Sequence, residues 1–135
     1  MKLALTLGCI AMLTGCSATV DLAYAERKAT AYAVDIDKAL AGKTAGKPQT
    51  CISLRDANGT EQVGDRTILY TVNKRLIYRN DPRGGCPSLG RDRTLVTRVY
   101  SSQLCRGDIV TPTDLVSGFS GGSCSLGDFV PYRSN

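Results

Sequence analysis

Four cysteines at positions 51, 86, 105 and 124 constrain the fold of this chain more than any other feature. The gaps between them are 34, 18 and 18 residues, no two form a Cys-x-x-Cys pair, and the chain has no histidine. These patterns lack the signatures of zinc sites, haem attachment and thioredoxin-like redox chemistry, so we expect no metal and no cofactor. In an oxidising compartment, an even number of cysteines predicts two disulfides.

The N-terminus predicts such a compartment. Met1 and Lys2 precede an apolar run from Leu3 to Leu13, which is shorter than the about 20 residues that a membrane-spanning helix needs. A positive start and a short apolar middle are typical of a signal peptide. The segment Leu13-Thr14-Gly15-Cys16 resembles the lipobox of bacterial lipoproteins, in which the cysteine is lipidated and the bond before it is cut. We therefore predict a signal peptide over residues 1–15 and a lipidated Cys16.

Two other interpretations of this segment stay open. Ordinary signal-peptide cleavage could use a small-x-small site at Cys16-Ser17-Ala18 or at Ala23-Tyr24-Ala25. Alternatively, Cys16 is an unmodified residue of the apolar run, like Cys9. If Cys16 is lipidated, its acyl chains hold the protein on a membrane, since two chains give stable anchoring. Ser17 stands where lipoproteins of the inner membrane often carry aspartate, which favours the periplasmic leaflet of the outer membrane.

Length and charge limit the possible functions. Of the 135 residues, 120 remain after removal of 15, which predicts one domain. Lys2 leaves with the signal, so the mature chain has 16 basic and 12 acidic residues and a net charge of +4. This excess is too small for the electrostatic field of a nucleic-acid-binding protein, so no nucleic-acid partner is expected.

Residues 21–41 are predicted to form a helix, because apolar residues recur every three or four positions. The stripe consists of Leu22, Ala25, Ala29, Tyr32, Ala33, Ile36 and Leu40. Asp21 could cap the start of this helix and Gly42 its end. The polar residues 42–50 then predict a linker. Residues 16–50 would therefore form a lipidated tether.

Residues 51–135 predict a domain of short strands, because β-branched and aromatic runs alternate with Gly, Asp, Asn and Pro. Strands are expected over residues 51–55, 67–72, 75–80, 95–104, 108–116 and 124–132. A two-residue turn at Asn73-Lys74 would set Leu69 opposite Tyr78, Tyr70 opposite Ile77 and Thr71 opposite Leu76. The predicted fold class is mainly β: a small antiparallel sheet or barrel-like domain with an N-terminal helix and two disulfides.

The strand order suggests how the cysteines pair. In an up-and-down meander, Cys51 and Cys105 lie at one end of the sheet, and Cys86 and Cys124 lie at the other. We therefore prefer Cys51–Cys105 and Cys86–Cys124 among the three possible pairings. A Greek-key crossing would change this preference. Each bridge is expected to add about 2–4 kcal/mol to stability.

Five short segments of residues 40–135 carry a resemblance to a known protein family. These are Cys51-Ile52-Ser53-Leu54-Arg55, Asp65-Arg66-Thr67-Ile68-Leu69, Cys86-Pro87-Ser88-Leu89, Leu104-Cys105-Arg106-Gly107-Asp108 and Cys124-Ser125-Leu126-Gly127-Asp128-Phe129. With them the chain resembles an uncharacterised family of small exported, often lipidated, proteobacterial proteins with a four-cysteine domain. The resemblance implies an envelope location and a compact disulfide-bearing domain. It brings no catalytic residues with it.

No catalytic residue is predicted. Without histidine, acid–base chemistry would depend on carboxylates, tyrosines or lysines. Asp65 and Asp108 each lie beside an arginine near a strand start, so a hydrolase with paired aspartates is one alternative, although capping of turns is the role we expect. Arg106-Gly107-Asp108 predicts a turn in which Gly107 has a positive φ. Residues 118–123 are expected to be a mobile connection.

Arginine is unusually frequent: residues 51–135 contain ten arginines and a single lysine. Arginine makes bidentate contacts to carboxylates and phosphates, so a face with Arg79 and Arg98 could contact an anionic envelope polymer such as lipopolysaccharide or peptidoglycan. A solvated surface explains the same count, since this region also has eight acidic residues. The expected function is a non-enzymatic envelope lipoprotein, held on the membrane by its lipid, that binds an envelope protein or polymer. A small apolar-ligand carrier of barrel shape is the alternative.

Overall fold

The computed structural model describes residues 17–57, 59–90 and 92–135, and the burial of side chains from residue 21 onward. The predicted signal peptide and Cys16 lie outside the described residues. In chain order the elements are α1 (Ser17–Ala39), β1 (Thr44–Ala45), β2 (Cys51–Ser53), the 3-10 helix η1 (Leu54–Ala57), β3 (Gly59–Val63), β4 (Thr67–Asn73), β5 (Leu76–Asn80), β6 (Thr94–Thr97), β7 (Gln103–Cys105), β8 (Ile109–Thr113), β9 (Cys124–Ser125) and β10 (Phe129–Arg133).

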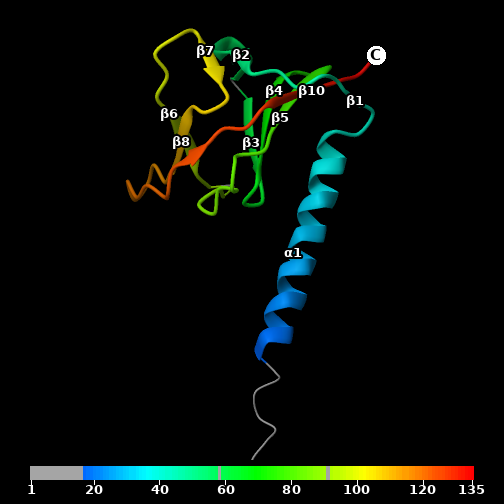
Figure 1. Cartoon of the computed structure of the whole chain (residues 1–135), viewed down its shortest axis with the longest axis vertical. Helices are drawn as coiled ribbons and strands as arrows, with labels where there is room; N and C mark the ends of the chain where they lie inside the picture. The colour runs from blue at the N-terminus through cyan, green and yellow to red at the C-terminus, as the bar shows by residue number, and fades with distance from the viewer. Residues whose placement is uncertain (1–16, 58, 91) are drawn as a thin grey trace, which may run out of the picture.

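A five-stranded antiparallel sheet forms the middle layer, with the strand order β1-β10-β5-β4-β3. The pair β2-β7 and the three-stranded sheet β6-β8-β9 cover one face of it. The C-terminal half of α1 covers the other face, while its N-terminal half extends beyond the domain (Figure 1). The predicted class is confirmed: a mainly β fold with antiparallel sheets, one N-terminal helix and two disulfides.

Two hydrophobic clusters, one on each face of the central sheet, follow from the alternation of side chains along its strands. On β4, Ile68 and Tyr70 face the small sheets, whereas Leu69 faces α1. The larger cluster also contains Ile52, Leu76, Tyr78, Cys86, Leu104, Val110, Cys124, Leu126 and Phe129. The smaller cluster joins Leu40, Val63, Leu69 and Ile77 to Tyr32, Ile36, Ala39 and Tyr132.

The helix begins at Ser17 and ends at Ala39, whereas the sequence predicted residues 21–41. Its alanine content favours a helix, and a glycine at position 42 with φ 69° lets the chain turn away after its last turn. The predicted linker is partly sheet: β1 pairs with β10, and Gln49 pairs with Phe129 through two backbone hydrogen bonds of 2.9 Å. Among the described residues, no helix is long and apolar enough to cross a membrane.

The predicted register of the β4–β5 hairpin is wrong by one residue. Tyr70 lies opposite Tyr78, and Thr71 lies opposite Ile77. The turn comes at residues 74–75 because the Asn73 side chain accepts a hydrogen bond of 2.8 Å from the backbone N–H of Arg75. An irregularity between Thr71 and Asn73 absorbs the extra residue.

The simple meander is also wrong. The single strand predicted over residues 95–104 is two strands, β6 and β7, in different sheets. The polar strand β3 was not predicted, because its buried Gln62 interrupts the apolar alternation. The Gln62 side chain is instead hydrogen-bonded to two other residues: it donates to the carbonyl of Arg93 and accepts from the N–H of Gly90 at 3.0 Å.

Both disulfides have the preferred pairing, although the reason differs from the meander argument. Cys51 and Cys105 lie directly opposite each other on β2 and β7, with a Cα–Cα distance of 4.0 Å. Cys86 follows β5, and Cys124 begins β9, so the second bridge joins the middle layer to the three-stranded sheet. Both hydrophobic clusters and both disulfides lie within the described residues.

Candidate functional site

A hollow with a volume of about 950 Å³ lies between α1 and one end of the central sheet. Its helix wall continues the stripe that packs on the sheet farther along, and consists of Tyr24, Ala25, Lys28, Ala29, Tyr32, Ala33 and Ile36. The opposite wall comes from the β3–β4 turn, the end of β5 and the loop after it. These residues are Val63, Asp65, Arg66, Thr67, Arg79, Asp81, Pro82, Gly84 and Gly85.

Tyr32 fixes the helix at the edge of this hollow. Its ring lies against Gly64, so closely that a Cβ added to Gly64 would overlap the ring. Gly64 has φ 65°, a conformation that side-chain-bearing residues rarely adopt. Glycine at this turn therefore serves both the backbone conformation and the approach of the helix.

Arg79 lies on the helix-facing side of the sheet, and its charge is used within the fold. Its Nε is 3.0 Å from a carboxylate oxygen of Asp81. Thr67 donates a hydrogen bond of 2.7 Å to the same carboxylate. This half-exposed network ties β4 to the segment that follows β5, so Arg79 mainly supports the wall of the hollow.

Lys28 and Arg66 are the cations that the hollow exposes. The Arg66 side chain is 83% exposed and lies 3.8 Å from Asp65, a surface contact of little energy. The Lys28 ammonium lies 5.7 Å from the centroid of the Tyr32 ring. Hydrogen bonding and attraction to the Tyr32 side chain raise the pKa of Lys28, so Lys28 is charged near neutral pH. The two cations come from α1 and from the β3–β4 turn.

The structure places Arg79 and Arg98 in different hollows, so they do not form the single face that the sequence suggested. Arg98 follows β6 and lines a smaller hollow of about 210 Å³ with Val96, Ile109, Thr111, Thr113 and Ser120. This hollow lies on the three-stranded sheet, whereas Arg79 lies on the central sheet beneath α1. The binding roles of both arginines stay predictions.

The two aspartates considered for catalysis lie in turns. Asp108 accepts a hydrogen bond of 2.7 Å from the N–H of Cys105 and so stabilises the turn between β7 and β8. In this turn Gly107 has φ 94°, as predicted, and Arg106 pairs with Asp128 at 3.0 Å. Asp65 lies in the β3–β4 turn, where its carbonyl accepts from the N–H of Cys86 at 2.7 Å.

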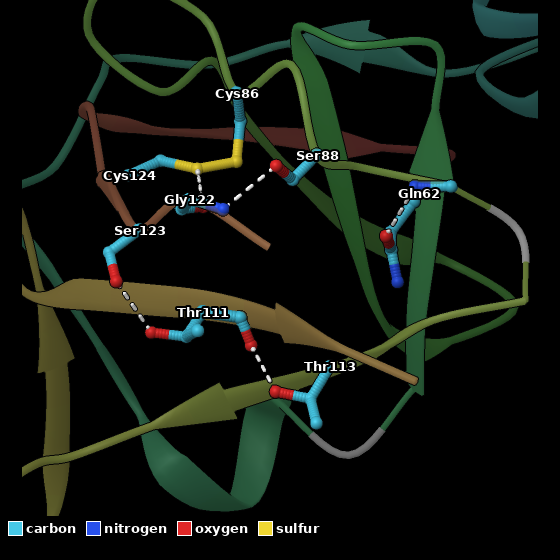
Figure 2. Close-up of a disulfide and its surroundings, with 9 residues drawn as sticks. Gln62, Cys86, Ser88, Thr111, Thr113, Gly122, Ser123 and Cys124 are labelled. Carbon is cyan, nitrogen blue, oxygen red and sulfur yellow. Dashed lines mark hydrogen bonds between the residues drawn. A yellow bond between two sulfur atoms is a disulfide. The ribbon is translucent and has the colours of Figure 1, made fainter. Parts of the chain in front are cut away.

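The glycine-rich segment 118–123, predicted to be a mobile connection, is held by hydrogen bonds near the Cys86–Cys124 bridge. Figure 2 shows the Ser88 hydroxyl accepting from the N–H of Gly122 at 2.9 Å and the hydroxyls of Thr111 and Ser123 in contact at 2.8 Å. The N–H of Gly121 also donates to the Pro112 carbonyl at 2.8 Å. The segment is thus an ordered extension of the three-stranded sheet.

Metal ligands and buried polar groups are the remaining candidate features of the described part of the chain. No group of three or more His, Cys, Asp or Glu residues there is placed to hold a metal ion. Tyr70 has the only buried side-chain polar atom without a hydrogen-bond partner among these residues, its hydroxyl. Burial raises the pKa of Tyr70, so its hydroxyl stays protonated in the core and is not available as a base.

The sequence predicted the apolar helix face that lines the hollow, but it did not predict a binding site there. The alanine-rich stripe predicted a buried helix face, whereas Lys28 and Arg66 line the same hollow only in the folded chain. Comparison with protein-family models, curated proteins and solved structures found no match to this chain. The resemblance to exported four-cysteine lipoproteins therefore stays a prediction.

Proposed function

We propose that this chain is a cell-envelope lipoprotein, anchored through Cys16, whose disulfide-linked β domain binds an anionic envelope polymer in the hollow beneath α1. The observation that carries the proposal is the convergence of Lys28 and Arg66 on this hollow from two separate elements. Neither cation is committed to the fold in the way that Arg79 is. The contacts that they do make, Lys28 with Tyr32 and Arg66 with Asp65, leave both side chains exposed to an incoming anion.

The rest of the lining suits an extended polymer better than a small enclosed ligand. Tyr24 and Tyr32 each add an apolar ring with a hydroxyl at its end, and the alanines between them add only methyl groups to the helix wall. Tyr24 is 67% exposed, so the hollow is open along the helix. An anionic polymer can therefore lie along an open hollow of this kind.

The apolar-ligand carrier has less support. The edge strands β1 and β3 of the central sheet do not pair with each other, so this sheet is open. The positions between the layers hold large, fully buried side chains, among them Phe129, Ile68 and Leu104. A ligand inside the domain would have to displace this core.

Binding of the purified lipoprotein in detergent to peptidoglycan and to lipopolysaccharide tests the proposal. We expect the double variant Lys28→Ala/Arg66→Ala to weaken binding of one of these polymers at least about tenfold, which corresponds to about 1.4 kcal/mol. The matched control is Lys74→Ala/Arg75→Ala in the β4–β5 turn, which removes the same charge away from the hollow. Equal losses in the two variants, or no binding of either polymer by the wild type, would overturn the proposal.

A further inference from the structure

The large apolar side chains that the β domain exposes come from one stretch of the sequence. Among the described residues after α1, the exposed ones are Val96, Tyr100, Ile109, Leu115, Val116 and Phe119. All six lie between residues 96 and 119, although the domain extends to residue 135. Val116 is 98% exposed, so it makes almost no contact with the fold. Five of the six belong to β6, β8 and the turn after β8, and apolar side chains gathered on one surface mark an interaction site, whereas scattered ones would need no explanation.

This surface belongs to an ordered part of the domain. Thr111 pairs with Val96 across β8 and β6, and alternation places Ile109 on the same outer face, while Val110 and Pro112 face inward. The turn after β8 then presents Leu115, Val116 and Phe119. The N–H of Asp114 donates to the Phe119 carbonyl at 2.9 Å, which closes this turn.

Two arginines lie beside apolar members of this surface. Arg98 lines the hollow beside Val96 and Ile109, and the Arg93 guanidinium lies 5.7 Å from the centroid of the Phe119 ring. The acid of the turn, Asp114, directs its carboxylate to the N–H groups of Ser117 and Val116. These hydrogen bonds lower the pKa of Asp114 and use its charge locally. Apolar tips with arginines beside them match a membrane surface, where phosphates lie above hydrocarbon.

The shape of the molecule allows this surface and the start of α1 to reach one plane. In Figure 1 the orange segment after β8 projects from the domain on the side away from α1, and the blue start of α1 projects below it. In this view the rest of the domain lies on one side of the line that joins these two projections. A flat membrane can therefore touch both.

We propose that the 114–119 turn, together with the outer face of β6 and β8, is a second membrane-contacting surface that inserts apolar side chains beneath lipid phosphates. The orientation it implies rests on the anchoring at Cys16 in the proposed function. With the chain held at both places, the domain would lie on the membrane rather than stand away from it. A protein partner on this surface is the alternative outcome of the test.

Tryptophan fluorescence can test this contact, because the chain contains no tryptophan. The full lipidated chain with Val116→Trp is reconstituted into vesicles of phosphatidylethanolamine and phosphatidylglycerol, with or without brominated acyl chains. We expect a blue shift of the emission and at least about twofold quenching by the brominated lipid. The control, Lys74→Trp in the exposed β4–β5 turn, should show neither change. Because residue 116 makes almost no contact with the fold, the substitution should leave the circular dichroism spectrum unchanged.

Flotation of the same vesicles separates this inference from the anchoring. A chain that floats but leaves position 116 as unquenched as position 74 overturns the second contact and keeps the anchor. A chain that does not remain bound on flotation, yet is quenched at position 116 when vesicles are present, keeps the inference and contradicts the anchor. A chain that neither floats with the vesicles nor is quenched at position 116 contradicts both the anchor and the second contact.

Discussion

Asn80 shows how a single polar residue can join two parts of this core. It is fully buried, and its amide nitrogen donates to the carbonyl of Gly127 at 2.8 Å and to that of Asp128 at 3.3 Å. Its amide oxygen accepts from the N–H of Gly127 at 3.0 Å. The end of β5 is thereby fastened to the turn before β10. A buried backbone group that loses such a partner costs about 1–3 kcal/mol.

We therefore expect Asn80→Ala to lower the free energy of unfolding by about 2–4 kcal/mol, because the N–H and carbonyl of Gly127 would lose their partner. Urea denaturation with both disulfides intact measures the change. The control is Asn73→Ala, which removes one exposed hydrogen bond to Arg75 and should cost less than about 1 kcal/mol. Similar losses in the two variants would show that the Asn80 contacts do not fasten the core.

At the scale of elements, the position of α1 decides whether the candidate site exists. The helix meets the β3–β4 turn where the Tyr32 ring covers Gly64. Gly42, after the helix, has nearly the same backbone conformation, with φ 69° against 65°, but nothing lies near the position of its absent side chain. The two glycines therefore separate backbone strain from helix docking.

Both Gly64→Ala and Gly42→Ala should cost about 1–2 kcal/mol through the left-handed backbone conformation. Gly64→Ala should cost more, because the methyl group overlaps the Tyr32 ring, and it should also weaken polymer binding in the hollow. Denaturation and binding of the two variants measure the difference. Equal costs and equal binding would contradict the docking of α1 on this turn.

Periodicity predicted those elements whose burial follows a regular pattern. The helix and the strands around 67–72 and 75–80 are of this kind. It missed β3, where Gln62 is buried through hydrogen bonds to Gly90 and Arg93 rather than through an apolar side chain. It misplaced the hairpin register, because the hydrogen bond from the N–H of Arg75 to the Asn73 side chain decides where the turn falls. The site depends on contacts between distant segments: Lys28 and Arg66 converge only after α1 docks.

At the scale of the whole molecule, the two disulfides have different tasks. Cys51–Cys105 joins neighbouring strands of a two-stranded sheet, whereas Cys86–Cys124 connects two layers. Cys86 is fully buried and belongs to the larger hydrophobic cluster. Loss of the second bridge should therefore affect the core as well as the entropy of the unfolded chain.

Replacing either pair by alanine should lower the free energy of unfolding by about 2–4 kcal/mol. The Cys86→Ala/Cys124→Ala variant should be the less stable, because the lost sulfur atoms also leave a cavity between the layers. Chemical denaturation of the two double variants measures the order. The opposite order would mean that the Cys86–Cys124 bridge does not hold the layers together.

The anchor at Cys16 would determine the oxidising compartment, the envelope ligand and the orientation of the domain on the membrane. Fractionation of cells that express the full chain tests it directly, with extraction of the membranes by high salt or by detergent. We predict that detergent but not salt releases the wild-type protein, and that Cys16→Ala prevents its attachment as a lipoprotein and frees it from the membrane. Wild-type protein that is soluble, or that salt releases as completely as detergent does, would contradict the account.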